Sequence, residues 1–158
     1  MKTNSYIDEI VQQGIELKNE DKFQQSIDVL EKVISNYPNY KKINGVMLLL
    51  AGNYYKLKLY ERSIDYSFKV VANNPKVELA NLLLYLSYFD LDEHEKAFMV
   101  LFSYLEKYPA DLFKDTLEEL LDGLIDGYSL NYEEDIISYA KKNDVDIPKG
   151  LLGGTNSN

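Results

Sequence analysis

The four prolines of this chain divide it into stretches of similar length. Pro38, Pro75, Pro109 and Pro148 follow one another in steps of 37, 34 and 39 residues, each just after an amphipathic stretch. Proline ends a helix because it has no N–H to donate and its ring clashes with the preceding turn. A period of about 34 residues is typical of stacked helical hairpins, which bury their apolar faces against their neighbours. The spacing therefore predicts one helical hairpin repeated along the chain.

Apolar residues recur at helical spacing, and no stretch shows the alternation of a β-strand. The fold that this pattern predicts is all-α, an α-solenoid of antiparallel helical hairpins. Asp111 is expected to cap the first helix of the last pair. Helices are expected at residues 7–18, 23–36, 44–56, 60–72, 78–89, 93–107, about 112–125 and 132–142.

At 158 residues, of which 46% are apolar and 27% charged, the chain has the size and composition of one globular domain. It has no cysteine, and its longest apolar stretch, Leu79–Leu91, is too short to span a bilayer. No signal-like segment is recognisable, so a cytoplasmic location is expected. The expected organisation is a single domain at 1–148, with repeats at about 7–40, 44–77 and 78–111, a capping hairpin at about 112–148 and a flexible tail at 149–158.

The net charge of −9 is concentrated near the C-terminus, where residues 111–158 hold 11 acidic against 4 basic side chains. Such a surface repels phosphate backbones, so nucleic-acid binding is not expected. It would attract a basic protein, or it serves only solubility. The candidate acidic face consists of Glu118, Asp122, Asp126, Glu133 and Glu134.

The chain shows no arrangement of side chains typical of an enzyme. His94 is the only histidine and has no cysteine or second histidine with which to hold a metal. Asp90 and Asp92 have the spacing of a calcium loop, but Glu95 stands where that loop requires glycine. The glycines form no phosphate-binding loop. We therefore expect no catalysis, no cofactor and no metal.

The copies that begin at Ile7, Asn44 and Glu78 resemble the tetratricopeptide repeat. That family has a proline at place 32, small residues at places 8 and 20, and aromatic residues at place 11 and at the start of the second helix. Small residues are needed where two helices approach within about 8–10 Å. The resemblance covers about residues 7–148 and implies a right-handed superhelix of hairpins. The matching residues are Gly14 and Ala51 at place 8, Tyr54 and Tyr88 at place 11, Phe23 and Tyr60 at the second-helix start, and Ser26, Ser63 and Ala97 at place 20; Leu17, Tyr85 and His94 depart from the pattern.

A fourth, degenerate copy is expected to begin at Thr116. Gly123 and Tyr132 are nine residues apart, as the small residue and the second-helix aromatic are in the first copy. Asp135 then stands at place 20, where the pattern has a small residue, so we expect this pair to be a capping unit.

In this family the first helix of each hairpin lines a concave groove. The resemblance implies an apolar groove here, with Tyr40 as a further candidate contact. Core packing is the alternative role for Leu82, Leu86, Phe89 and Tyr55, and it is favoured for Leu82. A clamp for a carboxylate is not expected, because apolar residues occupy its positions: Val11, Ile15, Leu49, Leu79 and Leu83. The predicted groove residues are Val11, Ile15, Leu48, Tyr55, Leu82, Leu86 and Phe89.

Two functions are left open. The resemblance favours a non-catalytic adaptor or scaffold that binds a peptide or amphipathic helix of another protein in the groove. The alternative is a small acidic chaperone or immunity-type inhibitor that binds a basic secreted or toxin protein through the acidic face. Formation of a homodimer through the uncapped Asn4–Lys18 end is a further alternative, because terminal hairpins expose apolar surface. Membrane insertion is not expected.

Overall fold

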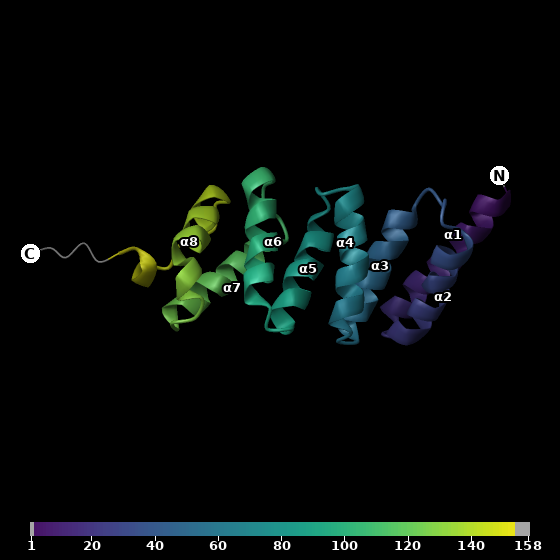
Figure 1. Ribbon diagram of the computed structural model, residues 1–158, viewed down its shortest axis with the longest axis horizontal. Helices are drawn as coiled ribbons and strands as arrows, with labels where there is room; N and C mark the ends of the chain where they lie inside the picture. The colour runs from purple at the N-terminus through teal and green to yellow at the C-terminus, as the bar shows by residue number, and fades with distance from the viewer. Residues whose placement is uncertain (1, 154–158) are drawn as a thin grey trace, which may run out of the picture. The chain divides into compact units, whose positions relative to one another are not determined.

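The computed structural model describes residues 2–153, and every regular element in that range is helical. Neighbouring helices pack against each other within the two compact units of this range, which confirms the all-α prediction and is consistent with a solenoid of helical hairpins. Figure 1 shows the helices in their order along the chain. The elements are α1 (Lys2–Asn19), α2 (Phe23–Asn36), α3 (Ile43–Lys56), α4 (Tyr60–Asn73), α5 (Glu78–Asp90), α6 (His94–Lys107), α7 (Phe113–Ile125), the 3-10 helix η1 (Leu130–Tyr132), α8 (Glu133–Lys142) and the 3-10 helix η2 (Lys149–Leu151).

The chain forms two compact units, and the boundary lies within α6, between Val100 and Leu101. In the first unit each helix from α1 to α5 packs on the next, and α3 also contacts both α1 and α5. In the second unit α7 packs on α8 and on η2. The single domain expected at 1–148 stays a prediction. Of the tail expected at 149–158, residues 154–158 lie outside the described part of the chain.

The first hairpin closes around a glycine. Ser26 Oγ donates a 2.6 Å hydrogen bond to the backbone oxygen of Gly14, and Asn53 Nδ2 donates to that Oγ at 2.8 Å. A Cβ at position 14 would lie 2.6 Å from Cδ2 and 2.7 Å from Cγ of Leu30, which is fully buried. The glycine therefore lets α1 and α2 approach closely, and the buried hydrogen bond from Asn53 ties α3 to this contact.

Each of the first three hairpins turns through one residue in the left-handed backbone conformation. Asp21, Lys58 and Asp92 have φ angles of 58°, 60° and 60°. The N–H of this residue bonds the carbonyl three residues earlier, and the next N–H bonds the carbonyl five residues earlier; in the first turn these bonds are 3.0 and 2.9 Å long. This pair of bonds is the Schellman motif, which closes the C-terminal end of a helix. In all three hairpins the second helix begins two residues after the left-handed one.

Glu31 on α2 joins the first hairpin to the second. Its two carboxylate oxygens accept hydrogen bonds of 2.7 Å from the hydroxyls of Tyr54 on α3 and Tyr66 on α4. Arg62 Nη2 lies 3.3 Å from the same carboxylate, and the guanidinium lies 5.2 Å from the Tyr54 ring centroid. Burial and the hydrogen bond to Glu31 raise the pKa of Tyr66. Because all four side chains come from different turns of three helices, the network fixes their register.

The α7–α8 hairpin repeats the third hairpin with a step of 35 residues. Helices α5 and α7 have 13 residues each and begin 35 residues apart, and α6 and α8 end 35 residues apart. The left-handed residues Asp92 and Gly127 are separated by the same step. Helix α8 begins later than this step predicts because a second left-handed residue, Ser129, and η1 come first.

One expectation for this hairpin is wrong. The copy begins at Phe113 and not at Thr116, and a Cβ at Gly123 would meet only Tyr128 Cβ, at an ordinary contact distance of 3.8 Å. This glycine therefore permits no close approach of helices. Helix α7 begins after Leu112, and the cap expected from Asp111 stays a prediction.

Candidate partner-binding groove

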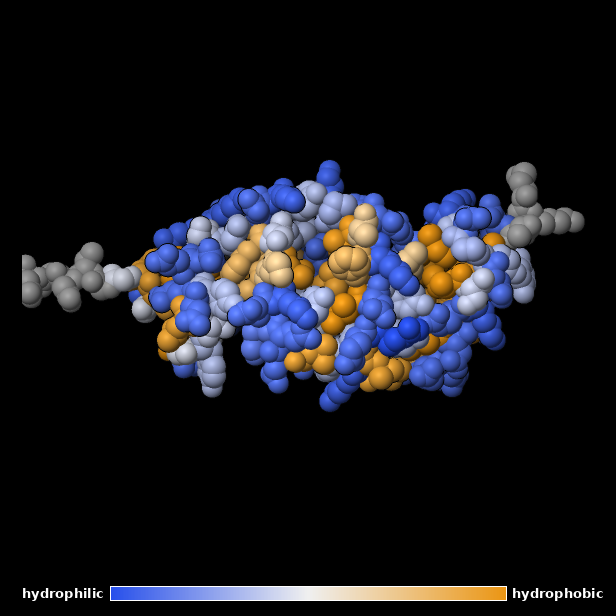
Figure 2. All heavy atoms as spheres, in the orientation of Figure 1, coloured by the Kyte–Doolittle hydropathy of each residue, from blue (hydrophilic) through white to orange (hydrophobic). Residues whose placement is uncertain are grey.

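Side chains of the first helices α1, α3 and α5 line a groove of about 720 Å³ in the first unit. Four predicted groove residues, Val11, Ile15, Leu48 and Tyr55, lie together along it and are half-buried. Figure 2 shows apolar side chains reaching the surface among hydrophilic ones. The apolar residues at the positions of the family's carboxylate clamp also line the groove: Val11, Ile15, Leu49, Leu79 and Leu83.

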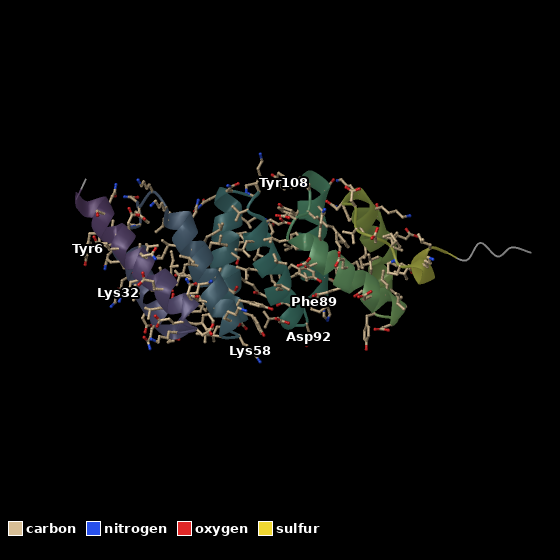
Figure 3. All side chains as sticks on the ribbon, turned by 180° about the vertical axis from the view of Figure 1, so that it is seen from behind. Tyr6, Lys32, Lys58, Phe89, Asp92 and Tyr108 are labelled. Atoms are coloured by element: carbon tan, nitrogen blue, oxygen red, sulfur yellow. The ribbon has the colours of Figure 1, made fainter. Side chains whose placement is uncertain are left out.

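The three remaining predicted groove residues lie on α5 outside this lining. Leu82, Leu86 and Phe89 are half-buried. The Phe89 ring, labelled on α5 in Figure 3, lies 5.7 Å from the Tyr85 ring and 4.6 Å from the His94 ring, centroid to centroid. Phe89 and His94 therefore pack against each other at the turn of the third hairpin, and partner contact by the three α5 residues stays a prediction.

Two glycines of α3 leave the floor of the groove unfilled. Gly45 and Gly52 both line the groove, and a Cβ at either position would meet nothing within 4 Å. A glycine inside a helix costs about 1 kcal/mol relative to alanine. Close packing against Leu30 explains the glycine at position 14, whereas no packing contact within the protein explains Gly45 or Gly52. They leave two positions on the groove side of α3, about two helical turns apart, without a side chain, and Leu48 and Leu49 line the groove between them.

Tyr55 connects α3 to α5 at the groove. Its hydroxyl donates a 2.8 Å hydrogen bond to Asp90 Oδ2, and its ring lies 5.6 Å from the Tyr60 ring, centroid to centroid. Burial and the hydrogen bond to Asp90 raise the pKa of Tyr55. The hydroxyl is therefore engaged within the chain, and Tyr55 offers its ring to the groove.

Tyr40 is buried, so its expected role as a groove contact is wrong. Only 4% of it is exposed, and its hydroxyl donates a hydrogen bond to Asp8 Oδ1 on α1. Lys42 Nζ donates to the same oxygen at 2.8 Å. These hydrogen bonds, from Lys42 and from Tyr40, lower the pKa of Asp8. The α2–α3 loop is thereby fastened to α1, a contact that the helical pattern does not reveal because Tyr40 lies between helices.

The groove carries more positive than negative charge. Lys18 stands in the last turn of α1 and Lys56 in the last turn of α3, and both line the groove. Neither forms an ion pair with another described residue, whereas Lys42, which also lines the groove, is paired with Asp8. Asp21 is the one acidic side chain in the described lining. The surplus is opposite in sign to the net charge of −9 of the whole chain.

The predicted acidic face lies on the second unit. It is spread over α7, the residue after it and the first turn of α8. Its exposed members are Glu118, Asp122, Asp126 and Glu134, and Glu133 is half-buried.

An apolar patch in the α7–α8 turn was not expected from the sequence. Ile125, Tyr128 and Leu130 are 54%, 70% and 56% exposed. They stand at the end of α7 and in the inserted turn, where helical spacing does not distinguish a buried from an exposed face.

Within the described part of the chain, none of the helices has the length and apolar character needed to cross a membrane. Among the same residues, no three histidine, aspartate or glutamate side chains are placed so that they could hold a metal ion.

The comparisons with known proteins agree with the hairpin geometry. A family model described as "Tetratricopeptide repeat" matches residues 13–40. This range begins beside Gly14, includes all of α2 and ends at Tyr40, beyond Pro38. No curated protein and no solved structure matches the chain significantly. Residues 13–40 thus match a tetratricopeptide repeat, and the eight described α-helices are consistent with repeats of this type.

Proposed function

We propose that this protein is an adaptor that binds a peptide or amphipathic helix of another protein in the groove of α1, α3 and α5, without catalysing a reaction. Tetratricopeptide repeats generally mediate protein–protein interactions. The observation that carries the proposal is the groove itself: three first helices present apolar side chains to one space, and Gly45 and Gly52 leave its floor unfilled.

The groove has enough partly exposed apolar surface to support a complex. Covering the exposed part of a half-buried side chain such as Val11, Ile15 or Leu48 stabilises a complex by roughly 1 kcal/mol. Association itself costs about 4–15 kcal/mol, so several side chains must be covered together. A segment with apolar residues along one face meets this requirement, because it contacts α1, α3 and α5 at once.

The test fills the groove without changing the interior of the protein. In Gly52→Phe the ring enters space that holds no other atom within 4 Å of the Cβ, so the helix should stay folded. A matched control, Gly150→Phe, adds the same ring at an equally unobstructed glycine in η2. We expect proteins cross-linked to the tagged wild type in cells to be lost with Gly52→Phe and kept with Gly150→Phe, measured by quantitative mass spectrometry. Equal recovery with both variants contradicts the proposal.

The same experiment addresses the chaperone or inhibitor alternative, which places a basic partner on the acidic face. Asp122→Asn with Asp126→Asn removes two exposed carboxylates from that face. A partner that survives Gly52→Phe but is lost with this pair, and that dissociates as salt is raised, supports the alternative.

A further inference from the structure

We infer that the groove selects an amphipathic helix that carries carboxylates at one end of its apolar face, an inference that rests on the proposed function. Its basis is charge complementarity. Lys18 and Lys56 line the groove without an ion-pair partner among the described residues, and Lys42 is already held by Asp8. A ligand carboxylate therefore finds two cations that the chain itself leaves unpaired.

The two lysines lie at the same end of the groove. Helices α1 and α3 run in the same direction, because each is followed by an antiparallel helix and both belong to successive hairpins (Figure 1). Lys18 and Lys56 are both in the last turn of their helices, next to the hairpin turns at Asp21 and Lys58. The two unpaired lysines are thus at one end, together with Asp21, the one acidic side chain in the described lining, while Val11 and Leu48 line the apolar part.

The glycines favour a helix as the occupant. Two helices approach closely where one of them presents little bulk, and Gly45 and Gly52 provide two such places on the groove side of α3, one on either side of Leu48 and Leu49. Acidic residues near the N-terminus of a helical ligand also stabilise that helix, because negative charge interacts favourably with the positive end of the helix dipole. One ligand geometry thus meets the apolar floor, the glycines and the lysines.

Lysines in the last turn of a helix also interact favourably with the helix dipole, and this purely structural role needs a separate readout. Replacing such a lysine lowers the stability of the helix whether or not it contacts a ligand. It changes the preference between an acidic and a basic ligand only when the lysine faces that ligand.

Salt dependence alone does not isolate this contact. The net charge of −9 repels an acidic ligand at long range, and salt screens that repulsion together with the local attraction. The local attraction and the long-range repulsion are separated by reversing the charge of a lysine in the groove and, in a second variant, of a lysine outside it. Both substitutions change the net charge equally. Lys32, an exposed lysine on α2 that does not line the groove, provides the matched control (Figure 3).

The experiment measures binding of two fluorescent peptides to the full chain by anisotropy. Both are helices of about 16 residues with leucine along one face, and they differ only in glutamate or lysine at one end. We expect the wild type to prefer the glutamate peptide. Lys18→Glu and Lys56→Glu should each weaken it about fivefold, the effect of roughly one exposed charge contact, and should strengthen the lysine peptide, whereas Lys32→Glu should change neither.

Three results overturn the inference: equal binding of both peptides, an equal effect of Lys32→Glu, or no binding of the glutamate peptide at about 1 mM. Gly52→Phe distinguishes the two levels of the argument. If it blocks both peptides but the charge preference is absent, only the present inference fails. If peptide binding persists in Gly52→Phe, the groove is not the binding surface and the proposed function fails as well.

Discussion

The turns of the first three hairpins and the turn of the last one share a backbone geometry and differ in their residues. Asp21, Lys58 and Asp92 adopt the left-handed conformation with a side chain, whereas the last hairpin uses Gly127. All four turns form the same pair of backbone hydrogen bonds, and they follow one another in steps of 37, 34 and 35 residues. The backbone turn, and not the proline, therefore keeps the period through the last copy.

Within each unit, polar contacts join the helices, and these contacts differ in kind between the two units. In the first unit a carboxylate, Glu31, binds two tyrosine hydroxyls and an arginine. In the second, Asn143 at the end of α8 is a neutral amide: its Oδ1 accepts a 2.7 Å bond from the backbone N–H of Ala110. Charged networks with several partners are expected to contribute more than one neutral bond.

Removing these two side chains should produce the largest difference. Glu31→Ala leaves the buried hydroxyls of Tyr54 and Tyr66 without their acceptor and should lower the free energy of unfolding by about 3 kcal/mol. Asn143→Ala leaves one buried backbone N–H unpaired and should cost about 1–2 kcal/mol. Urea unfolding followed by circular dichroism measures both, with Glu31→Gln as an intermediate. Equal losses would show that the network adds nothing beyond a single bond.

The sequence pattern assigns Gly14 and Gly123 to the same place of their copies. Substitution by alanine should nevertheless change stability in opposite directions at the two positions. Gly14→Ala forces a methyl group against the buried Leu30 and should destabilise by about 1–2 kcal/mol. Gly123→Ala meets only an ordinary contact and should stabilise by up to about 1 kcal/mol, because alanine favours a helix. Urea unfolding of both variants at one pH compares them. If Gly123→Ala lowers the stability as much as Gly14→Ala does, both glycines permit close packing, and the contrast drawn from the structure is wrong.

The smallest effects should come from exchanging residues between the turns. Lys58→Gly removes the side chain from a residue in the left-handed conformation and should stabilise the protein by about 0.5–1 kcal/mol. Gly127→Ala, at a φ of 86°, should destabilise by about 1 kcal/mol. Thermal melting should shift upward for the first and downward for the second by a few degrees. Shifts of the same sign would mean that the two turns do not share one backbone requirement.

The sequence predicts the helices well because each buries an apolar face at regular spacing. Helix α2 has the predicted bounds, 23–36, and all other helix ends except one lie within one residue of the prediction. The start of α1 is the exception: it begins at Lys2, five residues before the predicted start. Tyr6 in this extension is 54% exposed, so the added turn shows no apolar periodicity that would reveal it.

The groove is predictable in part. Val11, Ile15, Leu48 and Tyr55 line one groove, because the repeat pattern fixes which face of the first helix each occupies, and their contact with a partner stays a prediction. Contacts between segments are not contained in that pattern. The burial of Tyr40 depends on its bond to Asp8, more than thirty residues away, which no local spacing indicates.

The hydrogen bonds of Tyr40 and Tyr55 have a consequence for the entropy of binding. Tyr40 fixes the loop before α3 to α1, and Tyr55 fixes the end of α3 to Asp90 at the end of α5. The three helices that line the groove are thus held in register before any ligand arrives, and little of the conformational freedom lost on association is their own. The ordering cost of a complex falls on the ligand, so a segment that is already helical in solution binds more tightly than a disordered one with the same side chains.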